Sequence, residues 1–391
     1  MKIALVTNVL PPQGRGGAEL YVAALGAALS RRGHDVGVIS GSAGVVPGVT
    51  VSRLPRRPDV PRDAGTVRKA VWHLTDLWRL EVHRDLRALL GAGGYDVVHT
   101  NSPQGLSSAV YSAVRAAGVP HVHMAHDYNA LCMRTSMTRG GAFCGGRCLS
   151  CRPQRVVRGG LLRRSVDVLV TATDYVRERH VEAGVAPAAD AVTIPYGVGE
   201  GWRRLRNLDD GHDPRLGYIG TLGAHKGVDV LLEAFARAPA SWRMAIAGVG
   251  PMEAQVRAAA AADGRIALHG FVTGEDKERF FDGLDLLLVP SVWEEPAGIV
   301  ALEATIRGLP FVVTDRGGLA ATPGAEVVAA GEPRALLDGI QRLLAGDALR
   351  TRSAQLLEEV EPPTLKRNVD AVERVLAEVA GRRQPRAVSS A

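Results

Sequence analysis

The stretch LDLLLVPSVWEEPAGIVALEA (residues 284–304) joins a strand pattern to a helix pattern. Its first part, Leu284–Val289, is an apolar run with the length of a buried strand. Pro296 then suits the first turn of a helix, where its missing N–H is not needed. Gly298 lets an anion approach the free amides of that turn, and the helix dipole favours negative charge there. The stretch therefore predicts a strand–loop–helix unit with an anion site at the start of the helix.

Two glutamates flank this predicted anion site. Glu295 and Glu303 stand eight residues apart, on either side of Gly298. Carboxylates beside a phosphate make sense where they hold hydroxyl groups, so the pattern favours a sugar or ribose diphosphate as the ligand. An ordinary amphipathic helix with solvent-facing glutamates is the alternative.

The same alternation of strands and helices runs through most of the chain. Near-continuous apolar strands separated by helices indicate parallel sheets that are covered on both faces. The predicted strands are Ile3–Thr7, Val36–Ser40, Val97–Asn101, His121–His126, Val166–Ala172, Val192–Pro195, Leu216–Ile219, Met244–Ala247, Ile266–His269, Leu284–Val289 and Phe311–Thr314. The fold class that follows is α/β, with two doubly wound, Rossmann-like sheets.

The polar stretch NLDDGHDP (207–214) interrupts the alternation and is typical of a linker between domains. We therefore expect an N-terminal domain over residues 1–205 and a C-terminal domain over 206–360. Residues 361–391 are expected to form a helix that packs back on the N-terminal domain, followed by a disordered tail. Because ligands bind at the carboxyl ends of the strands in such sheets, two facing domains predict a cleft.

The composition is that of a globular protein: the 391-residue chain is 46% hydrophobic and 23% charged. Its first residues, MKIALVTNVLPP, lack the features of a signal peptide, and no apolar run approaches the ~20 residues of a membrane span. These features predict a cytoplasmic protein with reduced thiols. Nothing in the sequence matches a nucleic-acid-binding motif, so we expect no nucleic-acid partner.

The formal net charge is +6, and the positive charge is concentrated in two segments. Eight arginines and no acidic residue lie between Tyr128 and Val166, and a second basic run extends from Arg53 to Lys69. Such patches favour an acidic partner or an anionic membrane surface, with the protein bound peripherally at the inner membrane surface. A solvated, arginine-rich face is the alternative.

Three further motifs lie at the ends of predicted strands. YIGTLGAHKGVDVLLEAF (218–235) places Lys226 between a strand and a helix, where its ammonium can meet a phosphate. PPQGRGGAELYVAAL (11–25) is glycine-rich but is not G-x-G-x-x-G, which disfavours nicotinamide binding. VHMAHDY (122–128) places His126 at the end of a buried strand. Taken alone, these motifs also fit a surface lysine, a turn-forming loop and a structural histidine.

Together the motifs resemble those of glycosyltransferase family 4, which has the GT-B fold. The matching segments, in the family's order, are GGAE in the first loop, HD after a buried strand, IPYGV (194–198), GTLGAHKG, GFV (270–272), PSVWEEPAGIVALEA, and GLP followed by VVTDRGG. The resemblance implies a retaining hexosyltransferase that uses a nucleotide diphosphate sugar. Its acceptor would be a lipid-linked saccharide, a polysaccharide or a natural product.

The resemblance also implies roles for individual residues. His126 matches the histidine near the reactive face of the sugar, Lys226 the lysine on the donor diphosphate, and Glu295 the glutamate on the donor sugar. Glu303 matches the glutamate that holds the ribose hydroxyls. The other implied contacts are those of Gly16 and Gly17 with the diphosphate, of Ala297, Gly298 and Ile299 with the sugar and phosphate, and of Phe271 and Val272 with the base.

One position departs from the family pattern. The family often has an arginine before the lysine, and that arginine also binds the diphosphate; here the position is Thr221. Either Arg15 or Arg316 supplies the missing charge, or donor binding is weaker. No Asp-x-Asp pair ends a strand, so we expect no catalytic divalent metal.

Rival functions need features that the sequence does not offer. A nucleotide-sugar epimerase on the same fold needs its own acid and base carboxylates, and a phosphorylase needs a cofactor lysine; neither can be assigned. A non-catalytic sensor built on the cysteines is the third alternative, and the nearly full set of donor-site residues argues against it.

All the cysteines of the chain lie in one insert, over residues 132–151. Cys132, Cys144, Cys148 and Cys151 have the spacing C-x11-C-x3-C-x2-C, which fits a structural zinc ion held by four thiolates. An iron–sulfur cluster or two reversible disulfides are the alternatives. The expected task of the insert is to hold an arginine-rich loop in place in the acceptor-binding domain.

Overall fold

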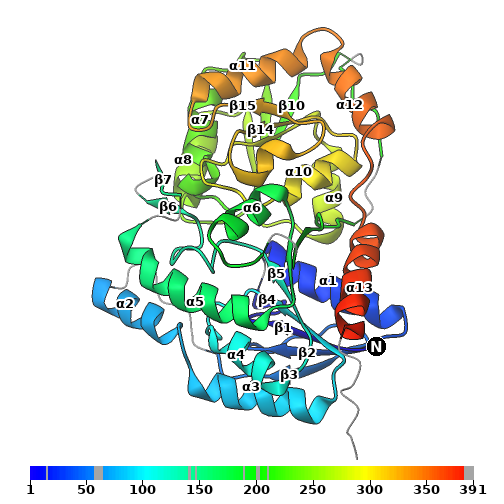
Figure 1. The fold of residues 1–391 in the computed structure, drawn as a ribbon. Helices are drawn as coiled ribbons and strands as arrows, with labels where there is room; N and C mark the ends of the chain where they lie inside the picture. Colours follow the sequence, from blue (N-terminus) through cyan, green and yellow to red (C-terminus); the bar gives the residue numbers. More distant parts are fainter. Residues whose placement is uncertain are drawn as a thin grey trace, which may run out of the picture. The chain divides into compact units, whose positions relative to one another are not determined.

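The computed structural model describes residues 1–14, 16–56, 65–139, 142–145, 148–187, 190–199, 203–208 and 211–382. The described chain divides into two compact units (Figure 1). Unit 1 comprises Met1–Met137, Cys144–Pro195 and Lys366–Ala391, and unit 2 comprises Thr138–Phe143 and Tyr196–Leu365. Arg15 and the end of the expected tail, residues 383–391, lie outside the described residues.

Unit 1 is built on a parallel sheet of seven strands in the order β3-β2-β1-β4-β5-β8-β9. The strands are β1 (Lys2–Thr7), β2 (Asp35–Ser40), β3 (Thr50–Arg53), β4 (Val97–Asn101), β5 (His121–Ala125), β8 (Val168–Thr171) and β9 (Ala191–Thr193). The helices are α1 (Gly17–Arg31), α2 (Thr66–Thr75), α3 (Leu80–Gly93), α4 (Ala109–Ala117), α5 (Arg152–Ser165), α6 (Asp174–Glu182) and α13 (Leu365–Gly381), with a 3-10 turn η1 (Leu149–Cys151).

Unit 2 repeats this architecture with six parallel strands in the order β12-β11-β10-β13-β14-β15. The strands are β10 (Arg215–Ile219), β11 (Arg243–Ala247), β12 (Ile266–Gly270), β13 (Leu286–Val289), β14 (Phe311–Thr314) and β15 (Glu326–Val328). The helices are α7 (Val228–Ala236), α8 (Glu253–Ala262), α9 (Gly274–Asp282), α10 (Ile299–Ile306), α11 (Pro333–Leu344) and α12 (Ala348–Glu358), with 3-10 turns η3 (Ala224–Lys226) and η4 (Gly317–Ala321). The short hairpin β6 (Thr138–Arg139) and β7 (Ala142–Phe143) is antiparallel.

The predicted α/β class with two doubly wound sheets is confirmed. In each large sheet the strand order reverses once, between β1 and β4 in unit 1 and between β10 and β13 in unit 2. Loops leave such a reversal in opposite directions, and the resulting crevice at the carboxyl ends of the strands is where ligands bind in open α/β sheets.

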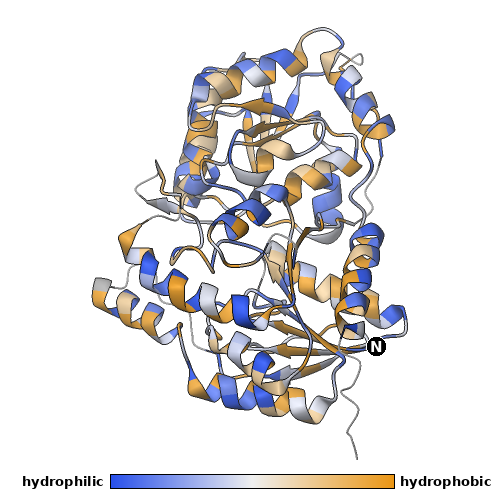
Figure 2. Ribbon diagram, viewed as in Figure 1, coloured by the Kyte–Doolittle hydropathy of each residue, from blue (hydrophilic) through white to orange (hydrophobic). Residues whose placement is uncertain are grey.

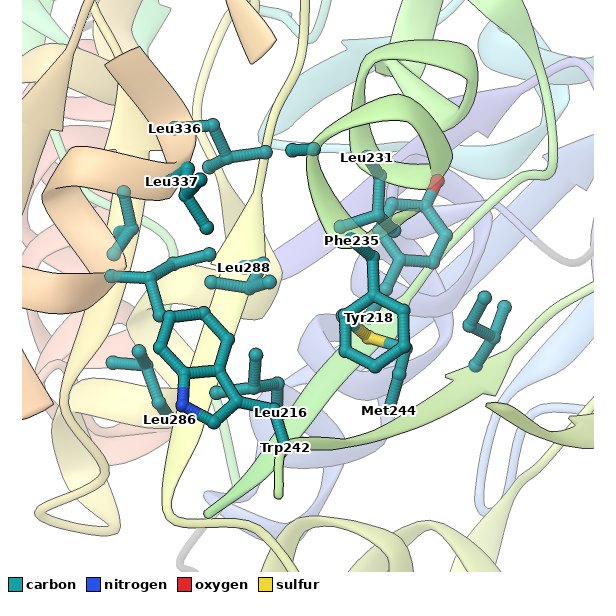
Figure 3. Close-up of a cluster of buried hydrophobic side chains, with 14 of the residues drawn as sticks. Leu216, Tyr218, Leu231, Phe235, Trp242, Met244, Leu286, Leu288, Leu336 and Leu337 are labelled. Carbon is teal, nitrogen blue, oxygen red and sulfur yellow. The ribbon is translucent and has the colours of Figure 1, made fainter. Parts of the chain in front are cut away.

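Buried apolar side chains cover both faces of the sheet in unit 2. Leu286 and Leu288 of β13 point into one cluster, which Figure 3 shows around Trp242 and Phe235. Leu287, the residue between them, belongs to a second cluster on the opposite face. In Figure 2 the strands are accordingly mostly hydrophobic, whereas the helices carry both colours. This two-sided burial is the reason why the strands read as continuous apolar runs.

The sequence predicts one helix over residues 69–90, whereas the structure has two helices there, α2 and α3. The chain breaks at Asp76, whose side chain is buried and paired with the guanidinium of Arg158 on α5. Asp76 Oδ1 also accepts a hydrogen bond of 2.8 Å from the Gly105 N–H. A buried carboxylate needs such partners, so the chain turns to supply them.

Five histidines lie in the sheet of unit 1 or beside it. Burial lowers the pKa of His99 and His180 to about 4 and that of His121 and His126 to about 3. Burial also holds the pKa of His123 well below its usual value, helped by the neighbouring imidazoles. All five rings are therefore neutral in the folded protein at neutral pH.

We predict that unit 1 loses stability as the pH falls below about 6.5, the pKa of histidine in an unfolded chain. The unfolded chain then binds protons that the buried rings do not, at about 1.4 kcal/mol per pH unit for each ring. Asp127, whose pKa is raised to about 6 by burial, gains a proton in the folded state and offsets about one ring. Melting temperatures between about pH 7.5 and pH 5.5 test this prediction, which a flat profile would contradict. His180→Leu is expected to make the decline shallower.

Candidate functional site

The strand-order reversal of unit 2 brings two loops together. Lys226 lies in η3, which follows β10, and Glu295 lies in the loop between β13 and α10. Because β10 and β13 are hydrogen-bonded neighbours, both loops start at the same edge of the sheet. The reversal therefore places a lysine and a carboxylate, predicted from separate motifs, at one point.

Lys226 and Glu295 form a direct ion pair. Lys226 Nζ donates to Glu295 Oε2 at 2.7 Å and to Oε1 at 2.9 Å. Glu295 Oε2 also accepts from Ser291 Oγ at 3.0 Å and from Trp293 Nε1 at 2.8 Å. The ammonium lies 5.2 Å from the centre of the Trp293 ring, a cation–π distance. The carboxylate of Glu295 is thus fully engaged by residues of its own unit.

Two glycines allow the loops to approach so closely. Gly227 has a φ of +70°, and a Cβ there would lie 1.9 Å from the Pro290 carbonyl oxygen. Gly317 has a φ of +60°, and a Cβ there would lie 2.3 Å from the Glu295 carbonyl oxygen. Any other residue at either position would force the backbone of the site apart.

The first turn of α10 is the predicted anion site. Gly298 is the residue before the helix, and among the described residues no side chain caps its amides. A Cβ at Gly298 would lie 2.3 Å from Leu319 Cδ1, so packing also requires glycine here. The Ile299 N–H donates to the Ala297 carbonyl oxygen at 2.9 Å. The amide of Ile299, one of the predicted backbone contacts, thus already has a partner within the loop.

Glu303 lies on α10 and has a different environment from Glu295. Its Oε1 accepts from Lys277 Nζ on α9. Its Oε2 is buried and accepts a hydrogen bond from no described residue. A buried carboxylate oxygen without a donor costs free energy unless a ligand or water supplies one.

The remaining predicted residues of unit 2 lie on the loops that follow β10, β12 and β14. Thr221 is exposed after β10, and its carbonyl oxygen accepts from Tyr218 Oη at 2.7 Å. Phe271 is 46% exposed between β12 and α9, whereas Val272 packs against a buried cluster. Arg316 Nη1 lies 3.7 Å from Glu294 Oε1, on the loop whose Gly318 N–H donates to Glu295 O at 2.7 Å.

His126 follows β5 in unit 1 and is half-buried. Its Nε2 lies 2.8 Å from Asn101 Oδ1, at the end of the neighbouring strand, and its ring packs edge-on against Tyr21. The lowered pKa of His126 keeps the ring neutral. A carbonyl oxygen only accepts hydrogen bonds, so Nε2 carries the proton. Such a ring can position a hydroxyl group through hydrogen bonds but supplies no positive charge.

The glycine-rich loop of unit 1 also has a defined structure at its end. Gly16 caps α1, Gly17 begins it, and both are exposed. The carboxylate of Glu19 folds back over Gly16, where a Cβ would lie 2.5 Å from Glu19 Oε2. These residues belong to unit 1 and the Lys226–Glu295 pair to unit 2.

The four cysteines are free thiols, two buried and two half-buried. Burial raises the pKa of Cys132 to about 11, with a further contribution from the thiols of Cys151 and Cys144. Cys144 Sγ donates to the Met137 carbonyl oxygen at 3.0 Å. Over the described ranges, no group of three or more His, Cys, Asp or Glu side chains is arranged to hold a metal ion.

Sequence reasoning missed three residues of the site in unit 2. Ser291 and Trp293 lie within the quoted motif, four and two residues before Glu295, and both donate hydrogen bonds to its carboxylate. Lys277 lies on a different helix, in the unremarkable pattern EDKERF, and only its contact with Glu303 distinguishes it. The alternation of charges around Lys277 is typical of a solvated helix, so no local signal pointed to it.

Comparison with known proteins shows that the chain is similar to glycosyltransferases. A family model described as Glycosyltransferase Family 4 matches residues 15–200, and one described as Glycosyl transferases group 1 matches residues 213–346. An uncharacterized 42.6 kDa protein in the cps region of Klebsiella pneumoniae is 27% identical, over 81% of this chain and 86% of its own. The D-inositol 3-phosphate glycosyltransferase of Xylanimonas cellulosilytica is 28% identical, over 87% and 86%.

The fold is shared with solved structures. Anabaena HepE, determined in complex with UDP and glucose, superposes with a TM-score of 0.73 at 18% identity, over 97% of this chain and 100% of its own. At that identity the match shows the GT-B fold alone, whereas the two family models together span most of the chain. The chain therefore belongs to the family-4 glycosyltransferases, enzymes that use a nucleotide sugar.

Proposed function

We propose that the protein is a retaining hexosyltransferase whose donor diphosphate binds beside Lys226, at the strand-order reversal of unit 2. The observation that carries this proposal is the contact between Lys226 and Glu295, from loops that follow two neighbouring strands. An ammonium has three N–H donors, and Glu295 takes two of them. The third remains for a phosphate oxygen, next to the uncapped first turn of α10.

The leaving diphosphate is the group that needs stabilisation in such a transfer. Negative charge develops on it as the glycosidic bond breaks, so the Lys226 ammonium and the positive end of the α10 dipole lower the barrier. Arg316, on the loop that packs against the backbone of Glu295, is the described candidate for the second charge that Thr221 does not supply. The acceptor hydroxyl attacks the same face of the sugar, and a donor phosphate oxygen takes its proton.

We predict that Glu303→Ala weakens donor binding about 10- to 100-fold, because hydrogen bonds from the ribose hydroxyls to a charged group are lost. Calorimetric titration with UDP-, ADP- and GDP-sugars gives the affinity, and NMR of the product gives the anomeric configuration, expected to be retained. Glu275→Ala is the matched control, since that side chain on α9 is 91% exposed. Interconversion of donors without transfer would favour an epimerase, and inversion would exclude the retaining mechanism.

The cysteine insert is proposed to hold one structural zinc ion. Support comes from the position of Cys132, near Cys144 and Cys151, and from the N–H groups of Arg134 and Met137, which donate to its sulfur and partly offset the burial that raises its pKa. Donors of this kind stabilise a thiolate, the form that binds zinc. Closing the site requires a local rearrangement that brings all four sulfur atoms within reach of one ion. The zinc would fix the insert that leads into α5.

We predict about one zinc ion per chain in protein purified without chelators, measured by mass spectrometry. Cys148→Ser should lower that content, and thiol titration should show the cysteines protected until the metal is removed. Zinc near zero, with four freely titrating thiols, would rule the site out.

The acceptor is proposed to be anionic and presented at an anionic membrane surface. The name of the Xylanimonas relative specifies an inositol phosphate acceptor. Val67, Val71 and Leu74 are 79%, 46% and 66% exposed along one face of α2, and Trp78 follows at 45%. Arg158 joins α5, which lies in the arginine-rich segment, to the end of α2, and Figure 1 draws the two helices side by side. Within the described chain, no helix is long and apolar enough to cross a bilayer.

The sequence pattern alone does not decide whether Trp72, Leu74, Trp78 and Leu86 pack in the core or face a membrane or an acceptor. Trp72 and Leu86 are buried, whereas Leu74 and Trp78 are exposed. Leu74 belongs to the exposed stripe on α2, which also carries Arg68 and Lys69, and Trp78 follows the end of that helix. An apolar stripe flanked by cations is the pattern of a helix that lies on an anionic lipid surface.

We predict that the protein sediments with vesicles containing phosphatidylglycerol and much less with pure phosphatidylcholine, and that salt weakens this binding. The double variant Val71→Asp, Leu74→Asp should lose binding, because it places charge in the apolar stripe. Val45→Asp is the matched control, since Val45 is 85% exposed on another loop of unit 1. Equal binding of both variants, or no lipid preference, would contradict the assignment.

A further inference from the structure

Glu303 is held by one oxygen and left open at the other. Lys277 Nζ donates to Oε1, while Oε2 is buried without a donor from any described residue. Glu295 differs, because four hydrogen bonds from Lys226, Ser291 and Trp293 occupy its oxygens. Of the two carboxylates assigned to the donor site, Glu303 is therefore the one with an oxygen that can accept a hydrogen bond from a ligand.

The Lys277–Glu303 pair is not needed to join α9 to α10. Arg307, which directly follows α10, pairs with Glu278 of α9 through two hydrogen bonds of 2.6 and 2.7 Å. Its guanidinium also lies 4.6 Å from the centre of the Phe281 ring of α9 and donates to the Glu303 carbonyl oxygen at 2.7 Å. The Arg307–Glu278 link joins the two helices independently of Lys277, which leaves the lysine for a separate task.

We propose that Lys277 is a positioning residue for donor recognition: it fixes Glu303 by Oε1 so that Oε2 receives a hydroxyl of the nucleotide ribose. The proposal rests on the proposed donor site and extends it to a residue on another helix. The ammonium neutralises a carboxylate whose side chain is only 12% exposed, and it restricts that side chain to one orientation. Lys277 itself makes no contact with the sugar that is transferred.

A fixed Glu303 carboxylate should discriminate between ribose and deoxyribose. A buried oxygen that is built to receive a hydroxyl stays unpaired when the ligand lacks it, so the deoxy analogue is rejected. Without Lys277, the carboxylate of Glu303 can turn toward solvent, and the loss of the ligand hydroxyl then matters less. Lys277 and one ribose hydroxyl should therefore be energetically coupled.

The test measures this coupling by calorimetry. Wild type and Lys277→Met are titrated with UDP, ADP and GDP and with the 2′-deoxy and 3′-deoxy form of each. We expect the wild type to bind one deoxy form at least about tenfold more weakly than its parent, and Lys277→Met to reduce that ratio to about two. Lys277→Arg should restore most of it. Arg279→Met, on the same helix with a side chain 69% exposed, should behave as wild type.

The outcomes separate this inference from the proposed function. If the wild type binds none of the nucleotides, the proposed donor site is wrong. If the wild type discriminates and Lys277→Met discriminates equally, the donor site stands and the role of Lys277 is refuted. A lower melting temperature with an equal loss of affinity for parent and deoxy forms would show a purely structural role, which also overturns the inference. Tighter ribonucleotide binding by Lys277→Met would show that the lysine competes with the ligand.

Discussion

The ion pair between Lys226 and Glu295 is the interaction on which the site in unit 2 depends. The side chain of Glu295 is only 11% exposed and that of Lys226 24% exposed, so each needs the other as a counter-charge. Removing one partner of such a pair leaves a charge without compensation in a place that water barely reaches. The pair therefore requires the loops after β10 and β13 to meet, and the glycines at 227 and 317 make that approach sterically possible.

Glu295 and Glu303 belong to one motif but contact different partners in the folded protein. Glu295 is saturated by donors from its own loop and from η3, which makes it a rigid anchor for the lysine. Glu303, eight residues further on and within α10, is held at one oxygen by a lysine of α9. The two glutamates therefore differ in chemistry although they belong to one motif. The direction in which each side chain leaves the backbone decides which helix or loop it contacts.

In unit 1 the histidines and the buried Asp76–Arg158 pair contribute mainly to the packing of the fold. The histidines are neutral because of burial, and His126 is fixed by Asn101 at the end of the adjacent strand. The buried pair of Asp76 and Arg158 ties the end of α2 to α5, the helix that follows the cysteine insert. This pair leaves an apolar stripe of α2 facing outward, since the inward face of the helix is already committed to Trp72 and Asp76.

The sequence by itself determined the alternation of buried strands and helices, the two doubly wound sheets, and the motifs that carry Lys226, Glu295 and Glu303. These features are encoded by local periodicity and by glycine and proline at particular turns, which neighbours in the chain reveal. Only the tertiary structure decided the break at Asp76, the helix α5 and the partner of Glu303. Arg158 stands 82 residues from Asp76, and Lys277 stands 26 residues from Glu303. Such pairs depend on how helices pack in space, and no local pattern contains that information.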